Sequence, residues 1–308
     1  MTLLSLLTAS ILRLTAPILL CAIGSLYCDR AGVTNISLEG TMLLSCFMGV
    51  FGSYFTGSWV LGIVCAVISG VLSSLFFALV SLKLGGAELV VGFTINVLMN
   101  GLTIYMLRTV FRVSGSLVSD KIIGIPSFSI PVLADIPIIG GLFSSLNIVI
   151  VIAFAAIILT QFIFKSTHFG LKVISSGENP QAAATVGINV YGIRLTCLII
   201  CGVMCGLAGA QLALGYLSLF TEGMTAGRGF IALMAVIFAR GKAMRVLFVT
   251  LLFGAAEMLS NQLQLFQYSS YLILMIPYIC VIILTLLQRK SSGWKKPLKT
   301  KGVHTNVF

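Results

Sequence analysis

The sequence predicts an all-α integral membrane protein, a polytopic bundle of about 8–10 transmembrane helices. Of its 308 residues, 58% are hydrophobic and 9% are charged, whereas a soluble domain carries about 25% charged residues. Apolar tracts that approach the roughly 20 residues of a membrane span recur along the chain. A membrane barrel would instead show alternating segments of about 10 residues, and these do not dominate. We expect one transmembrane domain over residues 1–288 and a basic cytoplasmic tail over residues 289–308.

The spans follow from the apolar tracts, taken in order. The first, at about residues 11–27, lacks a basic leader region and a cleavage pattern, so we expect it to be retained. A glycine-containing stretch at 29–40 follows, and the second span ends near Phe55. The later spans are expected at about residues 58–82, 88–111, 146–164, 193–214, 246–262 and 268–288, with a short apolar segment ending at Ala239 before the last two. A longer segment at 112–145 is able to form an external lid or hairpin.

Glu39 lies where the apolar run of the second span begins. A carboxylate at membrane depth usually faces the bundle interior or a water-filled cavity. Asn35, Ser37 and the flanking glycines favour a broken or re-entrant helix whose backbone lines a cavity. Glu39 is therefore either an acid at a helix N-terminus or part of a transport pathway. The segment at 223–239 also pairs a glycine-containing loop with an apolar helix, which is consistent with internal inverted symmetry.

Two further pairs of polar residues interrupt apolar spans. Asn96 and Asn100 are four residues apart, and so are Glu257 and Asn261. Residues with this spacing share one face of a helix. Each pair is either a source of hydrogen bonds to neighbouring helices or part of a pathway for a polar substrate. We keep both interpretations, with Glu257 as a candidate for the pathway because it is ionisable.

The polar stretch at 166–192 contains a short helix with its own boundary signals. Asn179 is suited to cap it, Pro180 to its first turn and Gly187 to its end. The residues between them are small, so the helix would present a smooth surface. The segment is either a structured loop or a docking element for a partner.

Charge predicts the orientation in the membrane. Lysine and arginine gather at 165–194, at 240–245 and in the tail, and all three regions fall on one side if each intervening tract spans. By the positive-inside rule that side is cytoplasmic, and the N-terminus is outside. The loop with Glu222 and Arg228 is then external. The net charge of +11 fits attraction of the tail to anionic lipid headgroups, and we expect no nucleic-acid partner.

Three motifs carry a resemblance to a known family. They are H-F-G-L-K followed by G-E-N-P-x-A-A-x-x-x-G-I at 168–188, D-R-A-G-V-T-N-I-S-L-E-G at 29–40, and G-R-G-F-I-A-L-M-A-V-I-F at 227–238. Together they resemble the permeases of ATP-binding-cassette importers for simple sugars, nucleosides and branched-chain amino acids. Among these, the sugar and nucleoside group is most similar.

The resemblance implies a set of partners and site residues. The coupling helix of such permeases sits in a groove of a separate ATPase subunit, a role that falls here to Gly177, Glu178, Asn179, Pro180, Ala182, Ala183 and Gly187. The region at 29–40 lies near the translocation path in the family, which supports Asn35 and Glu39 as pathway candidates. A second permease, the same or different, and an extracytoplasmic solute-binding protein are further expected partners. The location implied is the inner membrane of a bacterium.

Several chemistries lack their motifs in the sequence. There is no G-x-x-x-x-G-K-[ST] phosphate loop, no H-E-x-x-H and no G-x-S-x-G. We therefore expect no enzymatic site, no metal and no cofactor on this chain, with ATP used by the partner. The cysteines at 197, 201 and 205 fit close helix packing better than metal binding. A proton- or ion-coupled transporter that uses Glu39 and Glu257 is the alternative.

Overall fold

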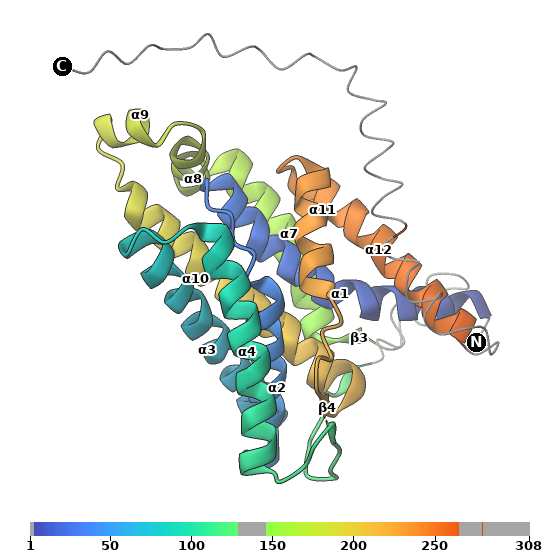
Figure 1. Cartoon of the computed structure of the whole chain (residues 1–308). Coiled ribbons are helices and arrows are strands. Elements are labelled where there is room, and N and C mark those ends of the chain that lie inside the picture. The colour runs from blue at the N-terminus through green and yellow to red at the C-terminus, as the bar shows by residue number, and fades with distance from the viewer. Residues whose placement is uncertain (1–2, 129–145, 265–278, 280–308) are drawn as a thin grey trace.

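The structure, a computed structural model, describes residues 3–128, 146–264 and 279 (Figure 1). Its helices are α1 (Leu3–Arg30), α2 (Leu38–Thr56), α3 (Trp59–Ala78), α4 (Glu88–Val110), α7 (Ile148–Ser166), α8 (His168–Glu178), α9 (Pro180–Thr185), α10 (Val190–Ala210), α11 (Arg228–Ala239) and α12 (Ala243–Gln264). Two π-helical segments, η1 (Leu79–Lys83) and η2 (Gln211–Leu217), continue α3 and α10. The strands are β1 (Ser116–Leu117), β2 (Ser127–Phe128), β3 (Leu146–Asn147) and β4 (Phe220–Thr221).

Seven helical segments among the described residues are long and apolar enough to cross a membrane. They are Thr8–Arg30, Leu38–Thr56, Trp59–Lys83, Glu88–Val110, Ile148–Ser166, Val190–Leu217 and Ala243–Leu263. A shorter apolar helix covers Arg228–Ala239. The predicted all-α polytopic bundle is thus confirmed. The span expected at 268–288, apart from residue 279, and the tail at 289–308 lie outside the described residues.

The first helix is longer than the apolar tract predicts. It continues through Asp29 to Arg30, and the charge of Arg30 in the last turn is favourable to the helix dipole. Its end is set by Gly32, which has a φ of 74°. The amide of Val33 donates to the carbonyl of Cys28 at 2.9 Å, and the amide of Gly32 donates to that of Asp29 at 3.1 Å. This pair of bonds is a Schellman motif, which satisfies the last carbonyls of a helix.

Close packing of α10 against α3 forms part of the core. A Cβ added to Gly202 would lie 2.7 Å from the carbonyl oxygen of Gly70, so only glycine fits there. On a neighbouring face, the Sγ atoms of Cys205 and Cys21 are 3.4 Å apart and join α10 to α1. The cysteines of α10 are buried free thiols. Small side chains therefore let these helices approach closely, as the spacing in the sequence predicts.

The end of the bundle opposite α8 and α9 carries the short strands (Figure 1). β1 pairs with β4 in antiparallel register, with Ser116 opposite Thr221. β2 and β3 are also antiparallel, with Ser127 opposite Asn147. The segment expected to form a hairpin or lid is therefore tied to distant parts of the chain through β1. Its remainder, at 129–145, lies outside the described residues.

The end with α8 and α9 is the cytoplasmic one. The turn after α1 meets α8 there, since a Cβ on Gly32 would lie 3.0 Å from the Cα of Gly177. Lys165 lies in the last turn of α7 and Lys242 precedes α12 at the same end, where both line one pocket. By the positive-inside rule this clustering assigns the end to the cytoplasm.

Candidate functional site

Two helices begin inside the bundle rather than at its ends. α2 begins at Leu38, and the amide of Gly40 donates to Oδ1 of Asn96 at 2.8 Å. Asn96 lies about 12 Å along α4 from its first residue, at about 1.5 Å per residue. α11 begins at Arg228, beside the first turn of α2. The interruption of the helices predicted at 29–40 is therefore confirmed, and its polar backbone needs partners within the protein.

Two asparagines supply those partners. Oδ1 of Asn35 accepts from the amide of Ser37 at 3.0 Å and from its hydroxyl at 2.6 Å. Asn35 is 2% exposed, and its Nδ2 lies 3.6 Å from Sγ of Cys201. Nδ2 of Asn96 donates to the carbonyl of Ile36 at 3.0 Å. The bonds of both side chains hold the backbone in front of α2, and those of Asn96 join it to α4.

Glu39 joins α2 to α11. Its Oε1 accepts from the amide of Gly227 and its Oε2 from the amide of Gly229, each at 2.7 Å. The carboxylate therefore caps the N-terminus of α11, where the helix dipole favours a negative charge. A Cβ on Gly229 would lie 2.6 Å from the Cα of Glu39, so the two backbones meet with no space for a side chain.

Arg228 forms an ion pair with Glu257 of α12. The two side chains are only 14% and 13% exposed. Nη1 of Arg228 also donates to the carbonyl of Met224 at 2.9 Å. Glu257 lies about 21 Å along α12 from its first residue, so the pair lies within the span. The prediction that Arg228 belongs to an external loop is wrong, because its guanidinium is drawn inward by the carboxylate.

Glu39, Arg228 and Glu257 thus come together around one helix N-terminus, although they are far apart in the sequence. Two polar atoms of the pair, Nε of Arg228 and Oε2 of Glu257, are buried and have no hydrogen-bond partner among the described residues. Such a group, inside a membrane span, can bind water or a polar ligand. The signal that could have identified Arg228 is its position between two glycines at the start of an apolar run.

The other two pathway candidates lie elsewhere. Asn100 on α4 and Asn261 on α12 are both exposed. Neither side chain has a hydrogen bond to another described residue. The structure therefore gathers Asn35, Glu39, Asn96 and Glu257 into the interior, and leaves Asn100 and Asn261 on the outside of this chain.

The segment at 166–192 forms two helices. The hydroxyl of Thr167 caps α8 by accepting from the amide of Gly170 at 3.1 Å. Oδ1 of Asn179 caps α9 by accepting from the amide of Ala182 at 3.0 Å, and Pro180 is the first residue of α9. Gly187 follows with a φ of 85°. The short helix begins and ends as the sequence predicts, whereas α8 was not expected.

The faces of α9 are not equivalent. Ala183 is 4% exposed and packs inward. Glu178, Asn179, Gln181, Ala182, Ala184, Thr185 and Gly187 are exposed. A hollow of about 540 Å³ lies beside them and is lined by Lys172, Val186, Gly187, Ile188, Asn189, Gly192, Ile193 and Thr196. α9 also projects from the end of the bundle (Figure 1). Its exposed side chains are available to a partner, and Ala183 anchors the helix to the rest of the chain.

The end of α8 rests directly on the turn that leads to α2. A Cβ on Gly177 would overlap the carbonyl oxygen of Arg30, so the two backbones are in contact. Nε of Arg194 on α10 donates to the carbonyl of Ala31 at 3.2 Å. The turn at 30–33 is therefore held between α8 and α10, only a few residues before Asn35 and Glu39.

Comparison with known proteins gives a consistent result. The family model described as branched-chain amino acid transport system / permease component matches residues 7–283. The guanosine ABC transporter permease protein NupQ of Bacillus subtilis is 35% identical, over 91% of each chain. The nucleoside ABC transporter permease protein NupC of Lactococcus lactis is 33% identical, over 82% of this chain and 80% of that one.

Two further matches extend this range. A putative glucose ABC transporter permease protein of Haloferax volcanii is 31% identical, over 80% of this chain and 74% of its own. A solved structure, PsaBC from Streptococcus pneumoniae in complex with Fab, has a similar fold with a TM-score of 0.50 and 14% identity, over 91% of this chain and 89% of that one. The chain is a multi-pass protein of the bacterial cell membrane and the permease component of an ABC importer, and it belongs to the branched-chain amino acid transport system permease family.

Proposed function

We propose that this permease component imports nucleosides and that a separate ATPase drives it through α9. The names of two of its relatives, a guanosine permease and a nucleoside permease, support the substrate class. The contact between Gly177 and the backbone of Arg30 supports the route of coupling. This contact carries the proposal, because it links the exposed α9 to the interrupted helices without an intervening flexible segment.

The ATPase docks on the exposed face of α9 and the hollow beside it. When it closes on ATP, α9 moves with it, and α8 transmits the displacement to the turn at 30–33. That turn leads directly to Asn35 and Glu39, and Glu39 holds the N-terminus of α11 through two bonds of 2.7 Å. The movement therefore reaches both interrupted helices at once, and alternating access follows from their displacement.

A second permease subunit covers the exposed face of α4. Asn100 lies on this face. If lipid covered it, its amide would lack hydrogen-bond partners, at a cost of about 2–7 kcal/mol. A protein partner or a water-filled pathway removes that penalty. The same face also carries Phe93 and Val97, which are exposed and suited to packing. On the outer side, a solute-binding protein delivers the substrate to the end that carries the short strands.

The fixed carboxylates favour ATP over a proton gradient as the driving force. Both oxygens of Glu39 are bonded to backbone amides, and Glu257 is paired with Arg228. A carrier carboxylate must bind and release its ion in each cycle, whereas both oxygens of Glu39 and Oε1 of Glu257 are occupied by contacts within the protein. Nucleoside uptake should therefore continue when a protonophore collapses the gradient and stop when ATP is depleted.

The test is uptake by proteoliposomes that contain the whole transporter. Labelled guanosine, ribose and glucose are supplied in turn with the binding protein. We expect guanosine uptake to exceed that of either sugar by at least about tenfold, since a site with hydrogen bonds to a base rejects ligands that leave them unpaired. Uptake of a sugar at the higher rate would contradict the nucleoside assignment and leave the importer assignment intact.

The docking surface is tested by Ala184→Arg, which adds a bulky cation to the exposed face of α9. Ala87→Arg is its control, because Ala87 is also exposed, at the cytoplasmic end between η1 and α4. We expect the first variant to stay folded in the membrane but to lose copurification with the ATPase and uptake. The control should retain both. Full uptake by Ala184→Arg would exclude this face as the coupling surface.

A further inference from the structure

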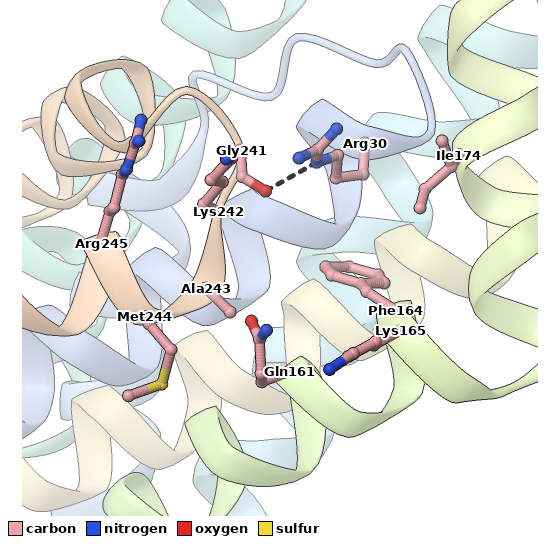
Figure 2. Close-up of a pocket in the computed structure, with 10 residues that line it drawn as sticks. All are labelled: Arg30, Gln161, Phe164, Lys165, Ile174, Gly241, Lys242, Ala243, Met244 and Arg245. Atoms are coloured by element: carbon pink, nitrogen blue, oxygen red, sulfur yellow. Dashed lines mark hydrogen bonds between the residues drawn. The ribbon is translucent and has the colours of Figure 1, made fainter.

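A basic pocket opens at the cytoplasmic end, where α1, α7, α8 and the turn between α11 and α12 meet (Figure 2). Its volume is about 450 Å³. It is lined by Arg30, Gln161, Phe164, Lys165, Ile174, Gly241, Lys242, Ala243, Met244 and Arg245. It is distinct from the docking face of α9 and its adjacent hollow, with which it shares no lining residue.

Among the described residues the basic pocket keeps an excess of positive charge, of which Asp29, next to Arg30 in the chain, offsets only a part. Four of the lining residues are cationic and none is acidic. The ion pairs of Arg108 with Glu222 and of Arg228 with Glu257 involve no cation of the basic pocket. Four like charges around one cavity repel each other. A bound anion would attract each of them and so offset this repulsion.

The side chain of Arg30 is held in place by the turn between α11 and α12. Its Nε donates to the carbonyl oxygen of Gly241 at 2.7 Å, the bond drawn in Figure 2. Gly241 has a φ of 68°, and a Cβ at this position would overlap the guanidinium. Glycine is therefore required twice, for the backbone conformation and for the approach of Arg30. This bond uses one of the five N–H donors of the guanidinium.

The first residues of α12 add to the positive electrostatic potential of the basic pocket. Ala243 and Met244 line the basic pocket, and they are the first two residues of α12. Amides in the first turn of a helix have no intrahelical acceptor, and the helix dipole places partial positive charge there. A phosphate oxygen is the usual ligand of such an arrangement when cationic side chains surround it.

The basic pocket is continuous with surfaces that are suited to lipid chains. Phe162 on α7 follows Gln161 of the pocket and is 59% exposed. Phe248 on α12 lies one turn beyond Met244 and is 68% exposed. Further along the same helices, Ile158 and Leu252 are exposed as well. A charged cavity at the membrane surface thus leads onto two apolar helix faces that run into the bilayer.

We propose that the basic pocket binds the phosphate-bearing headgroup of an anionic phospholipid of the cytoplasmic leaflet. The acyl chains lie along the exposed faces of α7 and α12. Basic pockets between membrane helices at the cytoplasmic side suit anionic headgroups for this reason. A soluble phosphate compound would use the same cations, but it would leave the adjoining apolar faces without a role.

The bound headgroup would link two moving parts of the protein. Ile174 belongs to α8, and Lys242 and Arg245 belong to the turn and helix that follow α11. Because Ile174 offers neither charge nor a hydrogen bond, the headgroup bridges the end of α1, through Arg30, and the start of α12, through Lys242 and Arg245. The proposal goes beyond nucleoside import and does not depend on the identity of the substrate.

The test compares the purified full-length chain in nanodiscs of neutral phosphatidylcholine and in nanodiscs that also contain phosphatidylglycerol. Lys242→Gln with Arg245→Gln removes two pocket charges. Lys83→Gln with Lys172→Gln is the matched control, because both residues are exposed at the cytoplasmic end and neither lines the basic pocket. Equal unfolding temperatures in neutral discs establish that all three proteins are folded.

We expect phosphatidylglycerol to raise the unfolding temperature of the wild type and the control, and to have little effect on the pocket variant. Native mass spectrometry should show retained phosphatidylglycerol in the first two and a loss of about 25-fold in affinity in the variant, about fivefold for each charge removed. Equal retention by all three proteins would overturn the proposal. Stabilisation of lipid-free protein by millimolar inorganic phosphate, with no added effect of phosphatidylglycerol, would overturn it in favour of a soluble ligand.

Discussion

Glu39→Gln tests the junction between α2 and α11. The carboxylate accepts two amide bonds of 2.7 Å, and glutamine keeps its length and shape. The carbonyl oxygen of glutamine can replace only one of these acceptors, because its NH₂ group would face the second amide. The variant therefore loses one charge-assisted bond, leaves one amide of the α11 N-terminus unpaired, and weakens the other bond.

The expected loss of stability follows from these changes. A bond to a charged group contributes about 1.5–3 kcal/mol, and an unpaired buried donor costs about 1–3 kcal/mol. The lost interaction with the helix dipole is up to about 2 kcal/mol in a partly buried site. Because these contributions overlap, we expect a total of about 3–5 kcal/mol. At about 2–4 °C for each kcal/mol, the unfolding temperature should fall by roughly 10 °C.

The measurement is thermal unfolding of the purified protein, followed by guanosine uptake in the assembled transporter. Glu88→Gln is a matched control, since Glu88 accepts one bond, from the amide of Thr34 at 2.6 Å, at an exposed position. We expect it to lower the unfolding temperature by less than about 3 °C, as an exposed bond is worth about 1 kcal/mol or less. If Glu39→Gln were as stable as this control and transported fully, Glu39 would not hold α11 as described.

Three further predictions concern single contacts. Gly177→Val places a side chain against the carbonyl of Arg30, so ATP hydrolysis should persist while uptake falls at least about tenfold; coupled uptake at the wild-type rate would contradict this. Arg228→Met and Glu257→Met should each destabilise by about 3–5 kcal/mol, and the double variant by clearly less than their sum; an additive result in thermal unfolding would mean that the pair does not interact. Gly202→Val should prevent folding because α3 lies against Gly202, whereas Gly101→Val should express normally because no atom lies within 4 Å of a Cβ at that position. Size-exclusion chromatography distinguishes the two, and a monodisperse Gly202→Val protein would refute the packing argument.

Much of the helical organisation could be predicted because it depends on local chemistry. Membrane spans follow from the length of apolar tracts, since backbone polar groups in lipid must be bonded within a helix. The limits of α9 follow from Asn179, Pro180 and Gly187, whose effects on a helix reach only a few residues. The interrupted helix at 29–40 could be predicted for the same reason, because glycine and polar residues precede an apolar run.

The candidate site could be predicted only in part. Glu39 and Glu257 stand out as acids within apolar tracts, but the sequence does not show that Arg228 pairs with Glu257. Ala183 and Ala184 are the same residue type and adjacent in the sequence, yet Ala183 is buried and Ala184 is exposed. α8 was missed because its glycines and serines are weak helix formers in isolation, and its packing against the turn at 30–33 stabilises it.

The sequence by itself determined that this chain crosses the membrane many times, where its short cytoplasmic helix begins and ends, and which side its basic residues face. These properties depend on hydrophobic length, capping and charge, which act between neighbours in the chain. Only the tertiary structure decided that Glu39 caps α11, that Arg228 turns inward to Glu257, and that Arg30, Lys165, Lys242 and Arg245 surround one cavity. Each of these contacts joins residues from different helices, and the distance between them is set by how the helices pack.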